Sequence, residues 1–531
     1  MTKGISGKGH KAFLDLAFCF VLGLTAGPAG AATYTVNTTN DTVDSSDGKC
    51  SLREAIQSAN GAGNGNCGPD SPGDDTIDFN VSGTITLGST LPNIVSASTA
   101  GKLTIDGTGQ TITISGGGSV RVMVVDSGAN LTLQNLTIAN GASSGDGAGI
   151  YNGGTLTVTN STFSGNTVIP PGAAGGGGIF NAGGTLTVTN STFSGNSAQF
   201  HGGGIFNAGG TLTVTNSTFS GNSAYHGGGI SNAATLTVTN STFAGNSAVG
   251  GGGIFNYGTL NVTNSTFSGN SASLGGGISV YTGSSATLQN TIIANSPSGG
   301  DCTGTLSGSN INNLIESTGT NACGLLNGVN GNIVGQDPAL GSLTGSPGYF
   351  PLNSGSPAID AGDNTTCANP PVSNQSQNGV TRPQDSDGNG TPICDIGSFE
   401  AQGPPVDAVD DAATFLANTS QSYNVGTNDQ YGTGSLPGSA TFSLLQTGTN
   451  CPSANINSTT GEATFTVPSS GSCVVAYQVC VGAVCDTAEL TITAWQRVEP
   501  IPTVDQRGLA ALVLLLVCTG LYLVRRRVVV V

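Results

Sequence analysis

The stretch TLTVTNSTFSGN, residues 185–196, decides the fold because the chain repeats it. Successive copies start 30, 26, 24 and 24 residues apart, at Thr155, Thr185, Thr211, Thr235 and Thr259. Two weaker copies flank them, NLTLQNLTIANG from Asn130 and ATLQNTIIANS from Ala286. A period in the twenties indicates a repeat architecture, in which each unit stacks on its neighbours.

Each unit contains three short apolar segments separated by turn residues. In TLTVT the apolar residues alternate with threonine, which predicts a half-buried strand. Residues 161–163 and the Ile-Phe-Asn of residues 179–181 predict two more strands, and Gly-Gly and Gly-Asn pairs mark the turns. Stacked coils would place Leu on Leu and Phe on Phe, about 4.8 Å apart. We therefore expect an all-β fold with a right-handed parallel β-helix, since parallel crossovers prefer that hand.

One asparagine column is in phase with the repeat. It consists of Asn160, Asn190, Asn216, Asn240 and Asn264, joined by Asn290. All but Asn290 precede Ser-Thr and also match the N-glycosylation sequon. We expect instead a ladder in which side-chain amides hydrogen-bond from coil to coil at a tight turn.

Composition and the N-terminus indicate an exported protein. The net charge of the 531 residues is −17, which argues against a nucleic-acid partner. Residues 1–32 combine three lysines, an apolar run and Ala-Gly-Ala-Ala at 29–32, and so predict a secretory signal peptide. An uncleaved anchor helix is the alternative.

Ten of the twelve cysteines lie between the signal and the C-terminal apolar run, and an even number in an exported chain predicts disulfides. Their clustering in pairs predicts sequential bonds: Cys50 to Cys67, Cys302 to Cys323, Cys367 to Cys394, Cys451 to Cys473 and Cys480 to Cys485. A zinc site is the alternative, but no histidine accompanies these cysteines and no CxxC spacing occurs.

The segment CSLREAIQSAN, residues 50–60, is the best helix start in the mature chain. Ser51 and Glu54 form a capping box, and Leu52, Ala55 and Ile56 share one face. This sequence resembles the CSLREA domain at the start of secreted bacterial β-helix proteins. Residues 33–75 are therefore expected to cap the first coil of a β-helix formed by residues 76–345.

Two further resemblances concern the β-helix itself. Its GGGI and FSGN segments (residues 202–205 and 219–222) look like motifs of chlamydial polymorphic outer-membrane proteins, which are adhesive surface proteins. Residues 290–401 are similar to the choice-of-anchor Q domain, through DPALG at 337–341, GSPAIDAG at 355–362 and CDIGSFE at 394–400. We expect residues 346–402 to form a disulfide-stapled C-terminal cap.

The C-terminal part predicts two more segments. After a Gly-Pro-Pro break, residues 404–495 alternate strands with turns, as in a small Ig-like β-sandwich, and DAVDD at 407–411 resembles bacterial cadherin-like and Ig-like repeats. Residues 496–531 look like the IPTL-CTERM sorting signal of exosortase substrates, with a transmembrane helix over residues 508–524 and an arginine stop. The resemblance implies a membrane stage and an exosortase-like protease as partner.

Residues that could carry chemistry are few. No Asp, Glu, Lys or Arg occurs from Gly147 to Gly300. His201 and His226 both precede a GGGI isoleucine by four residues, so they should stack in adjacent coils, and Asp146 should lie in the same column two coils away. We expect the two histidines to be exposed polar residues at a variable turn rather than part of a metal or catalytic site. Asp385, Asp387 and Asn389 match the first half of a calcium loop, but position twelve is Ile396, so an ordinary turn is favoured.

Two functions remain open. The first is an exported, envelope-anchored surface protein of a Gram-negative bacterium, structural or adhesive, with a β-helix surface for a glycan or protein ligand and no cofactor. The second is a carbohydrate-active β-helix enzyme, a lyase or hydrolase, which needs paired acids or a base with calcium. Its acids would come from the irregular early coils: Asp74, Asp75, Asp78, Asp106 and Asp126, which show no repeated pair at matched positions.

Overall fold

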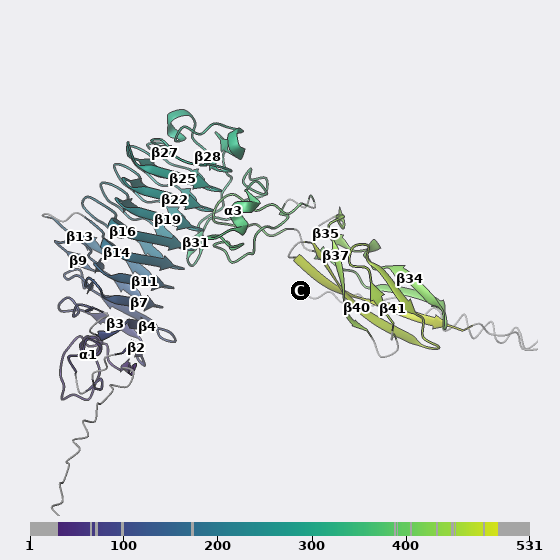
Figure 1. The fold of residues 1–531 in the computed structure, drawn as a ribbon, viewed down its shortest axis with the longest axis horizontal. Helices are drawn as coiled ribbons and strands as arrows, with labels where there is room; N and C mark the ends of the chain where they lie inside the picture. Colours follow the sequence, from purple (N-terminus) through teal and green to yellow (C-terminus); the bar gives the residue numbers. More distant parts are fainter. Residues whose placement is uncertain are drawn as a thin grey trace, which may run out of the picture. The chain divides into compact units, whose positions relative to one another are not determined.

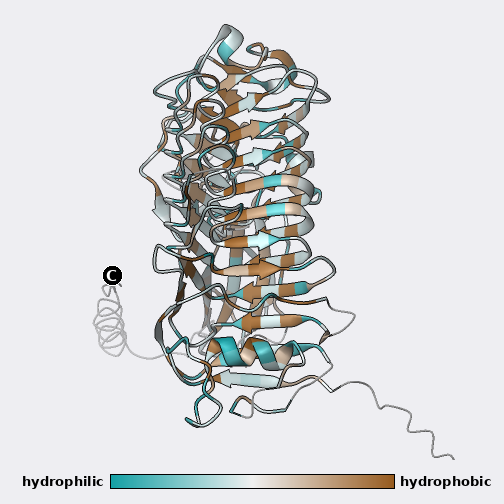
Figure 2. Cartoon of the chain, turned by 90° about the vertical axis from the view of Figure 1, so that its left-hand side faces the viewer, coloured by the Kyte–Doolittle hydropathy of each residue, from teal (hydrophilic) through white to brown (hydrophobic). Residues whose placement is uncertain are grey.

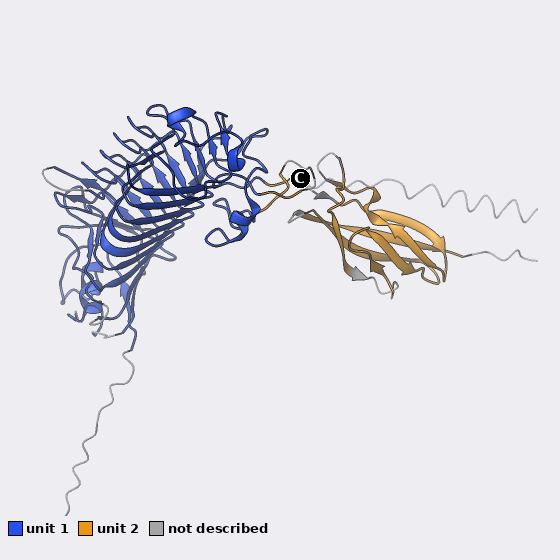
Figure 3. Ribbon diagram, turned by 45° about the horizontal axis from the view of Figure 1, so that its top comes forward, with its two compact units in different colours: residues 1–382, 394–401 blue, residues 383–393, 402–531 orange. Residues whose placement is uncertain are grey.

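The computed structural model describes residues 30–496, except 64–65, 70–72, 97–99, 171–174, 387–388, 390, 404–405, 432–433, 448–450, 452 and 482–483. The predicted signal peptide and transmembrane helix lie outside the described residues, apart from residues 30–32. The chain divides into two compact units: unit 1 holds residues up to 382 with 394–401, and unit 2 holds 383–393 with the residues from 402 on (Figure 3).

Unit 1 is a stack of coils whose strands form two long parallel sheets (Figure 1). The 16-stranded sheet contains β1 (Thr33–Val36), β2 (Asp75–Phe79), β4 (Leu103–Asp106), β6 (Met123–Val125), β7 (Asn130–Gln134), β10 (Ile150–Asn152), β11 (Thr155–Thr159), β14 (Ile179–Thr189), β16 (Ile205–Thr215), β18 (Ile230–Asn232), β19 (Thr235–Thr239), β21 (Ile254–Asn256), β22 (Thr259–Thr263), β24 (Ile278–Val280), β25 (Ser285–Gln289) and β27 (Cys302–Thr303). The 11-stranded sheet contains β3 (Gly83–Thr86), β5 (Ile112–Ser115), β8 (Thr137–Ala139), β12 (Thr162–Ser164), β15 (Thr192–Ser194), β17 (Thr218–Ser220), β20 (Thr242–Ala244), β23 (Thr266–Ser268), β26 (Ile292–Ala294), β28 (Leu314–Ile315) and β29 (Ile333–Val334). A parallel β-helix is thus confirmed.

The core is organised by columns of identical side chains. Phe193 pairs with Phe219 in register, and their ring centroids are 4.8 Å apart with nearly parallel planes. The predicted phenylalanine column is fully buried over its whole length: Phe163, Phe193, Phe219, Phe243 and Phe267. The triple glycines make room for it, because a Cβ on Gly229 would lie 2.9 Å from the ring of Phe243. The repeat therefore needs both the phenylalanine and the glycines.

Two coils differ from the predicted three-strand unit. In β14 and β16 the Ile-Phe-Asn and TLTVT segments run on as single strands of 11 residues. The Ala-Gly-Gly that joins the segments in these two coils pairs in the sheet, with Ala182 opposite Gly209, instead of forming a separate turn.

The N-terminal helix forms where the capping box predicts it. In α1 (Leu52–Ala59), Ser51 and Glu54 cap each other's backbone N–H groups. Leu52, Ala55 and Ile56 are fully buried and join the core beside β1. α1 lies at the N-terminal end of the stack, as expected for a cap (Figure 2).

The asparagine ladders lie in columns other than the predicted one. Asn160 and its equivalents have positive φ, between 46° and 49°, and so form the expected tight turn, but the structure shows no amide chain along this column in the described residues. The reason is that in this conformation the amides turn away from one another; that of Asn240, for example, donates to the carbonyl oxygen of Gln375. Buried ladders run through two other columns: Asn152, Asn181, Asn207, Asn232 and Asn256, and Asn166, Asn196, Asn222, Asn246 and Asn270.

Residues 346–382 and 394–401, which belong to unit 1, differ from the predicted end cap because they lie along the side of the stack. The hydroxyl groups of Thr218 and Thr242 donate to Gly348 and Gln377, and Ser398 bonds to Thr266. This segment contains α3 (Asn364–Ala368) and buries Ile396 against the 11-stranded sheet. The hydroxyl groups of Thr218, Thr242 and Thr266 are buried and need hydrogen-bond partners, and this segment supplies them.

The structure contains five disulfides, between the same five cysteine pairs that the sequence predicts. Three lie in unit 1. The bond from Cys50 to Cys67 holds the α1 region, that from Cys302 to Cys323 the last coils, and that from Cys367 to Cys394 the side segment. These bonds exclude a cysteine-ligated zinc site.

In its described residues, unit 2 contains three sheets, the two larger of which share one hydrophobic core. One sheet is β33 (Asp411–Leu416), β41 (Val484–Trp495), β40 (Ser472–Val481) and β37 (Thr441–Thr447); another is β34 (Ser420–Asn424), β39 (Glu462–Thr466) and β38 (Asn455–Ile456); a third is β32 (Val406–Asp407), β35 (Gln430–Tyr431) and β36 (Gly434–Ser435). The alternation of strands and turns predicted for residues 404–495 is present, for example in β37, β39, β40 and β41. The Ig-like classification stays a prediction.

In the part of the chain that the structure describes, no helix is long and apolar enough to span a bilayer.

Candidate functional site

A band of aromatic rings crosses the outer face of the 16-stranded sheet. In each Ile-x-Asn strand the isoleucine and the asparagine point inward, so the middle residue points outward. Tyrosine or phenylalanine occupies that middle position in four coils, and rings from neighbouring turns join them. We define the aromatic band as Tyr151, Phe180, His201, Phe206, Tyr225, His226, Phe255, Tyr257 and Tyr281.

Each ring of the aromatic band contacts the next. Phe180 lies 5.3 Å from Tyr151 and 5.4 Å from Phe206 between ring centroids, and Phe206 lies 4.8 Å from His201. Further along the stack, Phe255 lies 4.4 Å from both His226 and Tyr257. Such pairs stabilise the sheet surface beyond simple burial.

His201 and His226 occupy the centre of the band. They stack in adjacent coils as predicted, with ring centroids 5.5 Å apart, and Ser231 Oγ lies 3.4 Å from Nδ1 of His201. The expectation that they are exposed turn residues is wrong: both are half-buried, because Ser231 replaces an outward phenylalanine and leaves space for the imidazoles. A Cβ on Gly250, at the next position of their column, would lie 2.8 Å from the ring of Phe255 and 3.2 Å from Nδ1 of His226.

Their surroundings keep both imidazoles neutral at pH 7. Burial lowers the pKa of His201, and the neighbouring His226 lowers it further, against a smaller opposite effect of Asp146. Burial also lowers the pKa of His226. A neutral imidazole could accept a proton, but each lacks a carboxylate partner in the neighbouring coils.

Three tyrosines form the most accessible part of the band. Tyr225 and Tyr281 are 49% and 56% exposed, and Tyr257 lies between them, with its ring centroid 5.2 Å from that of Tyr281. Tyr225 joins them through His226, whose ring centroid lies 4.6 Å from that of Tyr225 and 6.0 Å from that of Tyr257. Burial raises the pKa of Tyr257, and Tyr281 and Tyr225 raise it further.

A small hollow opens beside Tyr281. Its volume is about 210 Å³, and its walls come from the turns that follow β24 and β27. Besides Tyr281 it is lined by Val280, Leu306 and four hydroxyl-bearing residues, Thr282, Ser284, Thr305 and Ser307, with no charged residue.

A positive charge lies at the other end of the band. The guanidinium of Arg121 lies 5.7 Å from the centre of the Tyr151 ring. It donates hydrogen bonds to the backbone carbonyls of Gly147 and Asp146, and the Asp146 carboxylate accepts the N–H of Gly175. Both side chains therefore hold turns together.

Three acidic side chains of the early coils each accept a hydrogen bond from a different group. Asp75 accepts the N–H of Ala32 and Asp74 that of Lys102, while Asp126 accepts from Asn93. Asp78 and Asp106 both face outward, but the register of β2 with β4 pairs residues only as far as Ile77 and Ile105.

Asp106 does not have the electrostatics of a catalytic acid. Burial acts to raise its pKa, but hydrogen bonds from Thr108, Gln134 and Asn135 outweigh burial and lower it. A general acid at neutral pH needs a raised pKa, as two close carboxylates would give.

Buried charges concentrate in the side segment. Arg382 is fully buried, 3.5 Å from the Glu400 carboxylate, and it donates to the backbone carbonyls of Asp395 and Gly397. Burial and the nearby Glu400 raise the pKa of Asp395 to about 7. Arg382 and the CDIGSFE motif thus build one polar cluster inside unit 1.

The calcium half-loop is described only in part, because Asp387 is outside the described residues. Asp385 is buried, and its carboxylate accepts the N–H of Asn389. Among the described residues, no group of three or more His, Cys, Asp or Glu side chains is placed to hold a metal. Calcium binding stays an untested prediction.

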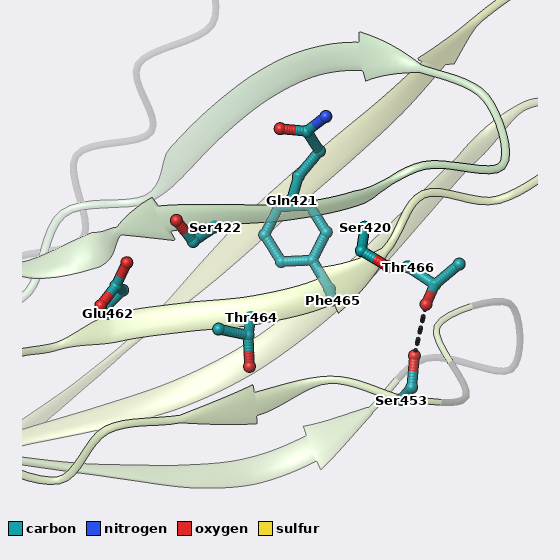
Figure 4. Close-up of a pocket in the computed structure, with 8 residues that line it drawn as sticks. All are labelled: Ser420, Gln421, Ser422, Ser453, Glu462, Thr464, Phe465 and Thr466. Atoms are coloured by element: carbon teal, nitrogen blue, oxygen red, sulfur yellow. Dashed lines mark hydrogen bonds between the residues drawn. The ribbon is translucent and has the colours of Figure 1, made fainter.

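Other hollows present one carboxylate or none. A hollow of about 410 Å³ lies where Ser346 and Pro347 meet the turns of Asn160 and Asn190. One of about 300 Å³ contains Asp363, whose carboxylate caps α3 through Thr366. In unit 2 a hollow of about 600 Å³ on β34 and β39 contains Glu462 among serine and threonine side chains (Figure 4).

Sequence reasoning found the histidines of the band but missed its tyrosines and phenylalanines. The sequence did contain a signal for these rings. Side chains of a strand alternate between its two faces, so the residue between the inward Ile and Asn faces outward, and phenylalanine (Phe180, Phe206 and Phe255) is unusual at an outward position.

Comparisons with known proteins agree with this architecture. A family model described as "Right handed beta helix region" matches residues 96–261 and 177–337. The body of the chain is a right-handed parallel β-helix. No curated protein matches the chain. A solved structure, "Crystal structure of pectate lyase Pel9A", has 16% sequence identity and a TM-score of 0.38, covering 71% of this chain and 98% of that chain. A likeness at this level carries no information on activity.

Proposed function

We propose that the chain is an exported, envelope-anchored bacterial surface protein whose β-helix is a non-catalytic body for structure or adhesion. One observation carries the proposal: the coils from Gly147 to Gly300 contain no charged residue and display hydroxyl groups, amides and the aromatic band. Such a surface can bind neutral ligands, but it offers no acid–base pair.

The cysteines support export. All ten cysteines of the described chain are in disulfides, which persist in oxidising compartments. The predicted signal peptide, the exosortase-type tail and the Ig-like spacer fit the same proposal.

Proteolytic shaving of intact cells tests the location. We expect peptides from both units to be released from intact cells, and mass spectrometry of the C-terminus to define the processing of residues 496–531. Deleting residues 501–531 should release the protein into the periplasm or medium. Retention of the truncated chain in the envelope would refute the C-terminal anchor.

A carbohydrate-active enzyme is the second candidate, and the outward acids of the early coils, Asp78 and Asp106, favour it. One oxygen of Asp78, Oδ1, is buried without a hydrogen bond among the described residues. The low pKa of Asp106 argues against it. Turnover of a polysaccharide that is lost in Asp78→Asn/Asp106→Asn would establish this function.

A further inference from the structure

We propose that the three tyrosines of the aromatic band and the hollow beside Tyr281 form a binding site for a neutral saccharide. The inference rests on the proposed non-catalytic binding function and names its ligand class. The site consists of Tyr225, Tyr257 and Tyr281 together with the hydroxyl-lined hollow between the turns after β24 and β27.

The site combines apolar faces with hydrogen-bonding groups. Sugar rings present C–H groups on their faces and hydroxyl groups around their edges, so they need aromatic surfaces beside polar groups. Tyr225 and Tyr281 offer exposed rings; the ring of Tyr257 lies 5.2 Å from that of Tyr281, and His226 contacts both Tyr225 and Tyr257. The hydroxyls of Thr282 and Thr305, both exposed, line the adjoining hollow, and neither is engaged by another described residue.

The size of the hollow limits what can enter it. About 210 Å³ is below the range of roughly 300–1,000 Å³ that is common for drug-sized ligands. It therefore suits one sugar ring, while further units of a chain would lie across the exposed tyrosines. Because the rings come from successive coils, such a chain would follow the axis of the stack.

The lack of cationic side chains near the site argues against charged ligands that also bind aromatic surfaces. Aromatic platforms also stack nucleobases, but nucleic acids need cations beside their phosphates. No lysine or arginine occurs between Arg121 and Arg382, and the chain carries a net charge of −17. The same lack of cations disfavours acidic polysaccharides, so a neutral saccharide is the favoured ligand.

Proline-rich peptides are the remaining competitor, since they dock on tyrosine-lined grooves. The hydroxyl-lined hollow at Tyr281 favours the sugar, because a proline ring has no hydroxyl groups to satisfy it. The experiment must include both ligand classes.

The test is calorimetric titration of the full-length protein with neutral oligosaccharides (gluco-, manno- and xylo-oligosaccharides), acidic oligosaccharides (oligogalacturonate and oligoalginate) and a proline-rich peptide. We expect binding of at least one neutral oligosaccharide, at least tenfold weaker binding of both acidic ones, and no turnover. Tyr281→Ala and Tyr257→Ala should each weaken binding by roughly tenfold or more.

Tyr151→Ala is the matched control, because Tyr151 belongs to the same band but lies several coils away; this variant should bind like wild type. Thr282→Val/Thr305→Val tests the hollow without removing a ring, and it should also weaken binding. Failure of all neutral saccharides, equal loss in the Tyr151→Ala control, or peptide binding alone that depends on Tyr281 would overturn the inference. None of these outcomes affects the shaving experiment, so the proposed function is tested separately.

Discussion

Nδ2 of Asn196 donates a hydrogen bond to Oδ1 of Asn222, 3.0 Å away in the next coil. The same oxygen accepts the backbone N–H of Asn196, and Nδ2 of Asn222 donates to the carbonyl of Phe193. Every polar atom of this buried side chain is thus satisfied, and the pattern repeats in neighbouring coils. Together with the apolar columns, the ladder therefore fixes which residues of successive coils lie opposite one another.

Asn222→Ala should therefore destabilise unit 1 substantially. It removes the acceptor of the Asn196 backbone N–H, one of the two acceptors of the Asn196 side-chain amide and a donor to the carbonyl of Phe193. Each buried group left unsatisfied costs about 1–3 kcal/mol. Denaturant unfolding followed by circular dichroism measures the loss. Asn190→Gly is the control, because Asn190 is exposed and its φ of 49° suits glycine. A similar change in both variants would contradict the ladder's role.

Phe219→Ala tests the apolar columns. Phe219 is fully buried between Phe193 and Phe243, so its loss should cost about 3–5 kcal/mol. Hydrogen exchange should show the effect concentrated in the coils that contain β15, β17 and β20. Phe200→Ala should have little effect because Phe200 is 42% exposed. A Phe219→Ala protein that melts like wild type would contradict the core assignment.

The histidine pair predicts a loss of stability in acid. Because the folded pKa values of His201 and His226 lie below the ordinary 6.5, the unfolded chain binds protons more readily. Their contribution is complete above pH 6.5 and is lost as the pH falls through the folded pKa values. His201→Phe/His226→Phe keeps the ring contacts and removes the titration. The difference in melting temperature between variant and wild type should grow from pH 7.5 to pH 5; a constant difference would contradict the burial of the pair.

For Asp395 we expect the opposite dependence of stability on pH. Its folded pKa of about 7 exceeds the ordinary 3.8, so its contribution to stability is complete below about pH 4 and is lost as the pH rises through 7. Asp395→Asn should remove this slope between pH 5 and pH 8, measured as the free energy of unfolding. An unchanged slope would place the responsible group elsewhere.

Arg382 should be essential to the side segment. Arg382→Met leaves the buried carboxylates of Glu400 and Asp395 without their cation, and breaking a buried pair in this way costs about 3–5 kcal/mol. Limited proteolysis should then cut within residues 346–401 before the coils. Arg53→Met is the control, because its partner Asp41 lies near α1. Equal protection of the side segment in both variants would contradict the role of Arg382.

The fold was predictable because its determinants are local and repeated. TLTVT has strand periodicity, Ser51 and Glu54 stand at capping-box spacing, and the cysteines cluster in pairs, so the strands, α1 and the disulfides followed from the residues. The position of residues 346–401 did not follow, because it depends on a long-range match between the Thr218 column and side-chain partners such as Gln377, more than 150 residues away.

The candidate site was harder to predict for a related reason. Asparagine suits both an interior ladder and a left-handed turn, so the sequence could not distinguish the column of Asn160 from that of Asn166. Tyr257 and Tyr281 follow strands in different coils and come into contact only through the stacking of these coils.

The central claim is that the uncharged coils bind a ligand without catalysing a reaction on it. Its most direct measurement is product release from pectin, alginate, glycosaminoglycans and peptidoglycan by the purified full-length protein. We predict none, because general acid–base catalysis, which contributes roughly 10²–10⁴-fold, requires an acid and a base in reach of the substrate, and His201 and His226 have no Asp, Glu, Lys or Arg beside them in the coils from Gly147 to Gly300. Turnover that disappears in His201→Ala/His226→Ala would contradict the claim for the coils, and turnover that disappears instead in Asp78→Asn/Asp106→Asn would make the protein an enzyme of its early coils.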